Sequence, residues 1–154
     1  MKLNLIIYGL LVLVAVGTVN ADDGTQEVSR LITKYAKQYN VEREILSCVL
    51  KTESNYRMGL VSDTEDYGMS QINIKTARMY QFNLMELLTN VDYSIKAAAI
   101  VLSNYRSAFR ESEIVNWVGR YNIGYQSLKS GGAGTAYQAY SSKVWSCRKS
   151  GNYL

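Results

Sequence analysis

A helix-patterned run that ends beside a glutamate constrains the fold of this chain most. Four apolar residues recur at the spacing of one helix face, and they are Ile45, Leu46, Val49 and Leu50. Glu53 follows them at the same periodicity. The pattern predicts a helix from about Glu42, with a buried face whose last turn carries a carboxyl group.

Helical periodicity continues through most of the remaining chain. Residues 56–73, with Gly59 and Gly68, are instead typical of a loop or a short hairpin, and residues 130–134 of a flexible loop. Neither a proline-rich linker nor an internal repeat interrupts the pattern, so we expect one mainly α domain. Asn90 is a candidate cap for the longest predicted helix. The other helices are expected at residues 28–39, 74–80, 84–88, 91–109 and 113–120, with a last one starting near Thr135.

The N-terminal residues have the pattern of a signal peptide. Lys2 precedes an apolar run at residues 3–16, and a small-residue site ends at Ala21. We expect residues 1–21 to be removed and residues 22–154 to form the mature domain. An uncleaved anchor is the alternative, although the run is shorter than the ~20 residues of a spanning helix.

Cys48 and Cys147 are the only cysteines, and both lie in the part that we expect to be exported. In an oxidising compartment they are expected to pair, and two buried free thiols are the alternative. The bridge would fasten the C-terminal region to the helix that carries Glu53.

The chain has no histidine, which excludes Ser-His and Cys-His nucleophiles and the usual zinc and iron sites. We therefore expect no metal and no cofactor, and chemistry by carboxylates, lysines or tyrosines. The formal net charge of +4 suits an anionic cell-wall polymer. This excess is too small and too dispersed to indicate a nucleic-acid partner.

Glu53 is the candidate acid. Cleavage of a glycosidic bond needs a carboxyl group that stays protonated near neutral pH, and burial against apolar and aromatic groups raises its pKa. The apolar helix face, together with Tyr56 and Met58, offers such surroundings. The alternative is a solvated glutamate at a helix end.

Four short motifs follow one another within residues 28–147. The motifs are Glu53–Ser54 with Tyr56, Gly68–Ile72, Tyr121–Gly124 and Tyr140–Val144. In this order they resemble the motifs of the soluble lytic transglycosylase family, peptidoglycan-cleaving members of the lysozyme-like superfamily. This chain departs from the family motifs at Ser70, where the family usually has methionine, and at Arg120, where it has alanine.

The resemblance implies a mainly α, α+β lysozyme-like fold and a reaction without water. Glu53 would protonate the bond between N-acetylmuramic acid and N-acetylglucosamine, then accept the proton of the muramic acid C6 hydroxyl, which leaves a 1,6-anhydro end. Tyr121 would steady Glu53 or the substrate's N-acetyl group, and simple capping is the alternative for Ser54. The residues implied to hold the glycan or support the site are Ser54, Gln71, Tyr121, Asn122 and Tyr140.

Asp66 leaves the reaction outcome open. The segment 66–73 also resembles the part of animal-type lysozymes that carries their second carboxylate. If Asp66 faces Glu53 at ~5 Å, a retaining hydrolase, that is a muramidase, becomes reasonable. If Asp66 caps a turn, Glu53 works alone.

The resemblance also extends to a biological setting. It is closest to small specialised transglycosylases that open gaps in the wall for secretion systems, pili or conjugation machines. We therefore expect a monomer in the periplasm or outside the cell that acts on peptidoglycan strands and can meet components of such an assembly. A non-catalytic wall-binding protein on the same scaffold is the alternative.

Overall fold

The computed structural model describes residues 21–108, 114–123 and 135–154. Residues 1–20 of the expected signal peptide and the expected glycine-rich loop at 130–134 lie outside this part. Among the helices described in these ranges, none combines the length and the apolarity that a membrane crossing requires.

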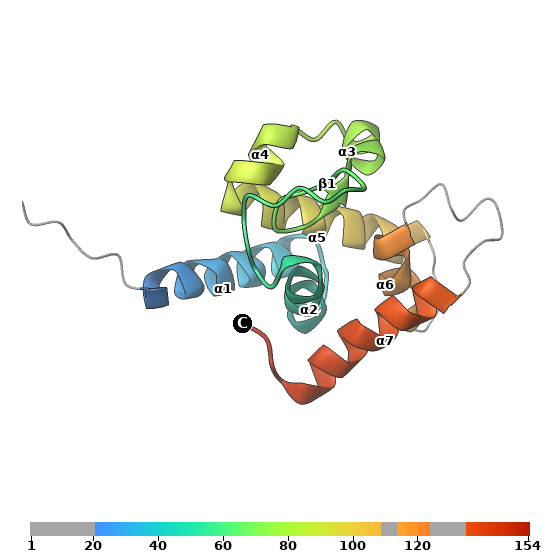
Figure 1. The fold of residues 1–154 in the computed structure, drawn as a ribbon. Coiled ribbons are helices and arrows are strands. Elements are labelled where there is room, and N and C mark those ends of the chain that lie inside the picture. Colours follow the sequence, from blue (N-terminus) through green and yellow to red (C-terminus); the bar gives the residue numbers. More distant parts are fainter. Residues whose placement is uncertain (1–20, 109–113, 124–134) are drawn as a thin grey trace, which may run out of the picture.

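Helices dominate the described part of the chain, and two short strands follow the second helix (Figure 1). The mainly α fold with a small hairpin, expected from the sequence, is confirmed. The elements are α1 (Ala21–Gln38), α2 (Arg43–Ser54), β1 (Asp66–Tyr67), β2 (Ile72–Asn73), α3 (Ile74–Tyr80), α4 (Leu84–Thr89), α5 (Val91–Ala108), α6 (Ile114–Ile123) and α7 (Thr135–Ser150).

Two helices differ from their predicted bounds. α1 begins at Ala21, before the apolar stripe that starts at Val28. Residues 23–27 are exposed and carry no apolar periodicity, so the sequence pattern did not indicate these first turns. α6 continues beyond Arg120 to Ile123, so Tyr121 and Asn122 lie on a helix.

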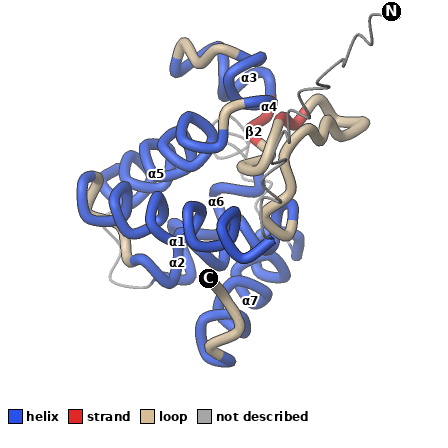
Figure 2. The backbone as a smooth tube through the Cα atoms, turned by 90° about the vertical axis from the view of Figure 1, so that its left-hand side faces the viewer, coloured by secondary structure: helices blue, strands red, loops and turns tan. Residues whose placement is uncertain are grey.

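The core forms where α2 and α5 meet. The apolar stripe of α2 is fully buried, and the three alanines at residues 97–99 of α5 are buried as well. Small side chains allow helices to approach closely. Figure 2 shows the result, with α3, α4 and the strands at one end of the molecule and α7 at the other.

The strands pair antiparallel, with Asp66 opposite Asn73 and Tyr67 opposite Ile72. The turn between them needs Gly68, whose φ is +72° and whose added Cβ would lie 1.8 Å from the carbonyl oxygen of Leu87. The hairpin is therefore fixed against α4.

Asparagine side chains begin the next helices. Asn73 accepts a hydrogen bond from the Lys75 amide at α3, and Asn83 accepts from two amides at α4. Asn90 accepts from the amide of Tyr93 at 3.1 Å, so its predicted role as a cap of α5 is confirmed.

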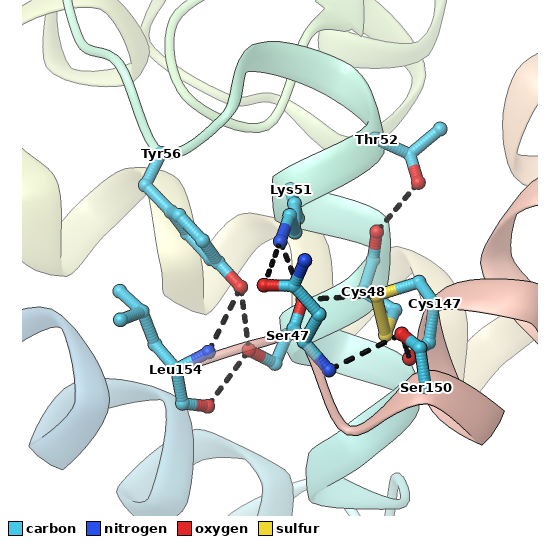
Figure 3. The surroundings of a disulfide bond; sticks show 9 residues. Ser47, Cys48, Lys51, Thr52, Tyr56, Cys147, Ser150 and Leu154 are labelled. Carbon is cyan, nitrogen blue, oxygen red and sulfur yellow. Dashed lines mark hydrogen bonds between the residues drawn. A yellow bond between two sulfur atoms is a disulfide. The ribbon is translucent and has the colours of Figure 1, made fainter.

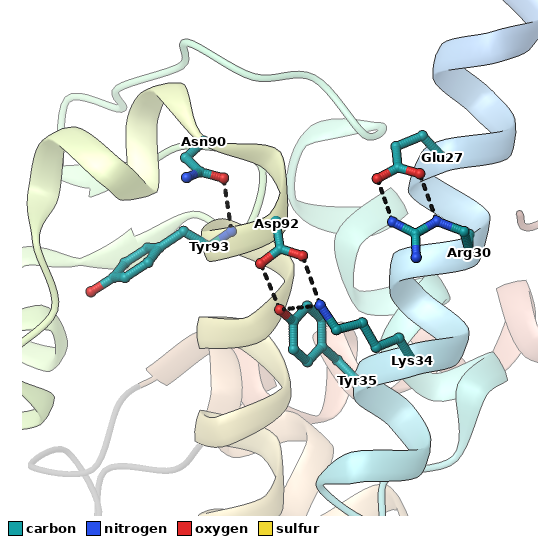
Figure 4. Close-up of polar contacts among 7 residues, drawn as sticks. All are labelled: Glu27, Arg30, Lys34, Tyr35, Asn90, Asp92 and Tyr93. Carbon is teal, nitrogen blue, oxygen red and sulfur yellow. Dashed lines mark hydrogen bonds and ion pairs between the residues drawn. The ribbon is translucent and has the colours of Figure 1, made fainter.

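A polar contact joins α1 to α5 (Figure 4). The hydroxyl of Tyr35 donates to Asp92 at 2.6 Å, and Lys34 donates to the other oxygen of Asp92 at 3.1 Å. The hydrogen bond from Tyr35 is the main reason that the pKa of Asp92 is lowered. This contact holds α1 against the first turn of α5.

The C-terminal residues are fastened to α2 (Figure 3). Cys48 and Cys147 form a disulfide with a Cα–Cα distance of 5.7 Å, which confirms the predicted pairing. Ser47 donates to the carbonyl oxygen of Leu154 at 2.9 Å, and Lys51 donates to the side chain of Asn152 at 2.7 Å. α7 is thus held close to α2, whose last turn carries Glu53.

Candidate active site

Glu53 lies in the last turn of α2, where Asn55 ends the helix in the left-handed conformation with φ of +52°. Its side chain is half-buried. The hydroxyl of Tyr140, which is buried on α7, donates a 2.6 Å hydrogen bond to Oε1 of Glu53. Two helices that are distant in the sequence therefore bring the carboxyl group and its donor together.

Burial raises the pKa of Glu53 to about 7. The hydrogen bond from Tyr140 opposes this increase in the pKa, and the charge of Asp66 adds to it. A pKa near 7 keeps a substantial fraction of Glu53 protonated at neutral pH. Glu53 can therefore act as a general acid and, after losing its proton, as a base.

The two tyrosines have different partners. Tyr121 donates to the carbonyl oxygen of Ser70 at 2.8 Å, whereas Tyr140 donates to Glu53. Burial is the main cause that raises the pKa of both phenols well above the ordinary value, and the charge of Glu53 adds to it. Both remain neutral donors, and the direct hydroxyl contact to Glu53 comes from Tyr140.

Ser54 is buried and supports the hairpin. Its hydroxyl donates to the carbonyl oxygen of Met69 at 2.8 Å, and it accepts from the amide of Arg57 at 3.2 Å. These bonds connect the residue after Glu53 to the loop at residues 68–71.

Gln71 and Asn122 differ in how they are held. Gln71 is half-buried with φ of +45°, and its amide nitrogen Nε2 donates to the carbonyl oxygen of Gly68 at 2.8 Å. Asn122 is exposed on α6, next to Tyr121.

Asp66 accepts hydrogen bonds at both of its carboxylate oxygens. Oδ2 accepts from Ser62 at 2.6 Å and from Thr64, and Oδ1 accepts from Nδ2 of Asn73 at 2.8 Å. The side chain is half-buried, and its charge is felt at both Glu53 and Tyr121. Asp66 therefore closes the loop and also contributes negative charge to the site.

The sequence analysis did not identify the hydrogen-bond partners of Asp66 or of the loop at residues 68–71. Asn73 could have been identified, because it ends the segment that resembles animal-type lysozymes. Ser70 and Ser94 are fully buried, and their hydroxyls share a 3.0 Å hydrogen bond, so Ser70 faces α5. Nothing in the sequence distinguishes Ser94 from other helix serines.

No group of three or more acidic or cysteine side chains in the described ranges is arranged to hold a metal ion. The groups that act on Glu53 are the hydroxyl of Tyr140 and the charge of Asp66. This arrangement suits proton transfer to and from a glycan.

Comparison with protein families decides which family has this site. The model of the transglycosylase SLT domain matches residues 30–143. The chain belongs to this family. The predicted membership of the lytic transglycosylase family is confirmed.

A solved structure shares the fold of this SLT domain. It is an inactive mutant of the lytic transglycosylase Slt from Pseudomonas aeruginosa, with a TM-score of 0.64 and 18% sequence identity. The match covers 82% of this chain and 24% of that chain, so the present SLT domain spans about a quarter of the longer protein. A comparison with curated proteins gives no match.

Proposed function

We propose that the chain cleaves the β-1,4 bond between N-acetylmuramic acid and N-acetylglucosamine and forms 1,6-anhydro ends. The observation that carries this proposal is the carboxyl group of Glu53, which has a pKa raised to about 7 and a hydrogen bond from Tyr140. Family membership supports the substrate class.

In the first step protonated Glu53 gives its proton to the glycosidic oxygen, and the bond to the muramic acid C1 breaks. The resulting oxocarbenium-like centre is stabilised by the neighbouring N-acetyl group. Ionised Glu53 then accepts the proton of the C6 hydroxyl while the C6 oxygen bonds to C1. Glu53 is protonated again at the end, and no water is consumed.

The surrounding residues have separate roles in this proposal. Tyr140 orients Glu53 through its hydrogen bond, and Tyr121 and Ser54 hold the loop at residues 68–71. Gln71 and Asn122 hydrogen-bond the glycan.

Asp66 acts as a fixed negative charge near the developing positive charge. Its carboxylate is held by three hydrogen-bond donors, while burial raises the pKa of Glu53. The charge of Asp66 at Glu53 also supports a second candidate, a muramidase in which Asp66 acts as the nucleophile and water completes the reaction.

The mass of the released muropeptides tests the two reactions, because they differ by one water for each cut. Purified peptidoglycan digested with the mature protein should release anhydro ends. Reducing ends would show a muramidase that uses Glu53 and Asp66. An absence of release, with a folded protein, would favour the non-catalytic wall-binding alternative.

We also propose that the protein acts in the periplasm or outside the cell. The disulfide between Cys48 and Cys147 supports this location, because such bonds persist in oxidising compartments. The mass of the protein recovered from its native host should correspond to a chain that starts at Asp22. Recovery of a chain that retains residues 1–21 would contradict cleavage.

Within that compartment, we propose a role in opening local gaps for a secretion, pilus or conjugation assembly. The resemblance to small specialised transglycosylases supports this role. A host that carries Glu53→Gln should lose assembly of the apparatus and keep normal growth and shape. A general defect in wall turnover with a normal apparatus would contradict the proposal.

A further inference from the structure

Hydroxyl groups from three helices hold the loop at residues 68–71. Ser54 of α2 donates to the carbonyl oxygen of Met69 at 2.8 Å, and Tyr121 of α6 donates to the carbonyl oxygen of Ser70 at 2.8 Å. The amide of Ser70 donates to Oγ of Ser94, on α5, at 3.1 Å. The peptide group between Met69 and Ser70 is thus held by both α2 and α5, and the next peptide group is held by α6.

Ser94, on α5, is in direct contact with the loop at residues 68–71. It is fully buried, as is Ser70, and the two hydroxyls share a second contact of 3.0 Å. Its Oγ is 3.3 Å from the position that a Cβ on Gly68 would occupy. A side chain at residue 68 would therefore crowd Ser94 as well as the backbone of Leu87.

We propose that Ser94 is a positioning residue of the transglycosylase, which sets the place of Gln71 through the backbone of Ser70. Ser94 is buried and does not reach a glycan itself. The inference rests on the proposed role of this loop, and of Gln71 in particular, in holding the substrate.

The backbone of Gln71 explains why such a support is needed. Its φ of +45° is uncommon for a residue other than glycine and persists only where the surroundings fix it. Without the hydroxyl of Ser94, the amide and the hydroxyl of Ser70 would lose their partner in the interior. A buried donor without a partner is unfavourable, so the loop would move to satisfy it.

Ser94→Ala tests the proposal on soluble, uncross-linked peptidoglycan strands. We expect KM to rise about tenfold and kcat to change less than about twofold, as for a lost binding interaction. The pH dependence of kcat should stay unchanged, because the hydrogen bond to Glu53 comes from α7 and not from α5.

Ser47→Ala is the matched control. Ser47 is equally buried on a helix, and its hydroxyl contacts Tyr56 and the carbonyl oxygen of Leu154, away from the loop. Both variants should lower Tm, but only Ser94→Ala should raise KM and speed hydrogen exchange at the amide of Ser70. A Ser94→Ala enzyme with wild-type KM would overturn the proposal.

Two more variants separate this inference from the role of Gln71. If Gln71→Ala raises KM and Ser94→Ala does not, the positioning role fails and the assignment of Gln71 stands. If Ser94→Ala raises KM and Gln71→Ala does not, Ser94 positions the loop, but the loop binds the glycan through a group other than Gln71. Should Ser94→Ala fail to fold, Ser94→Cys replaces the hydroxyl that accepts from the amide of Ser70 by a weakly accepting thiol, and a KM that stays at the wild-type value would overturn the proposal.

Discussion

Glu53 and Asp66 are two carboxyl groups of one site in opposite surroundings. Glu53 ends a buried helix, and the described contacts give its carboxyl one hydrogen bond, from Tyr140. Asp66 begins a short strand and accepts hydrogen bonds from Ser62, Thr64 and Asn73. Both side chains are half-buried, so exposure alone does not separate them.

The number of donors distinguishes the two groups. Burial raises the pKa of Glu53, and a single donor compensates only in part. The carboxylate of Asp66 accepts from three donors, and its charge adds to the raised pKa of Glu53. One fold thereby keeps an acid and an anion in the same site, and each variant below changes one side of this contrast.

Glu53→Gln should have the largest effect. The amide keeps the size and the hydrogen bond of the side chain but carries no proton to transfer, so we expect a loss of about 10²–10⁴ in kcat. Turnover of peptidoglycan strands measures the loss, and the far-UV circular dichroism spectrum should match the wild type. Activity within a few-fold of wild type would rule out Glu53 as the acid.

Asp66→Asn should lower kcat by about tenfold to a hundredfold, since it removes the charge that stabilises the oxocarbenium-like centre. The pKa of Glu53 should also fall, because the charge of Asp66 contributes to its increase. The pH profile of kcat/KM should therefore lose activity at a lower pH. Asp63→Asn, an exposed neighbour in the same loop, is the control.

The raised pKa of Glu53 also predicts how stability depends on pH. The folded protein binds this proton more tightly than the unfolded chain, whose group titrates near 4.5. This proton stabilises the folded state fully below pH 4.5, and the stabilisation is lost as the pH rises through about 7. The free energy of unfolding should fall by up to about 3 kcal/mol over this range.

Denaturant unfolding at pH 4.5 and pH 8 measures this loss in the wild type and in Glu53→Gln. The variant should gain stability relative to the wild type at pH 8 and not at pH 4.5. An equal difference at both pH values would show that Glu53 has an ordinary pKa.

Tyr140→Phe should have the smallest effect on the difference between Glu53 and Asp66. It should shift the pKa of Glu53 in the direction opposite to that of Asp66→Asn. Its hydroxyl lowers the pKa of Glu53, so its removal should raise that pKa. The alkaline limb of kcat/KM should move to higher pH, by less than about one unit. Tyr39→Phe, where a half-buried tyrosine lies beyond the end of α1, should leave the profile in place. A downward shift in Tyr140→Phe would contradict the assigned role.

The sequence predicted α2 and the place of Glu53 in its last turn because both follow from local patterns. The apolar stripe of α2 fixes its buried face, and Glu53 falls at the end of that stripe. The cysteine pair followed from composition, since Cys48 and Cys147 had no other partner of their kind.

The contacts of the site could not be predicted in the same way. The chain has 13 tyrosines, and only the packing of α6 and α7 decides that Tyr140 reaches Glu53 while Tyr121 reaches Ser70. The contact of Ser94 with Ser70 depends on how α5 packs against the hairpin. The resemblance indicated residues near the site, whereas the partner of each hydroxyl is a property of the folded chain.

The contact between Glu53 and Tyr140 has a consequence for the order in which the enzyme matures. A chain synthesised from its N-terminus completes α2 long before α7, so Glu53 exists for most of synthesis without the phenol that orients it. Cys147 comes later still, and its bond to Cys48 holds the two helices together. The contact that orients Glu53 therefore forms only when almost the whole domain has been made, and the disulfide secures it afterwards.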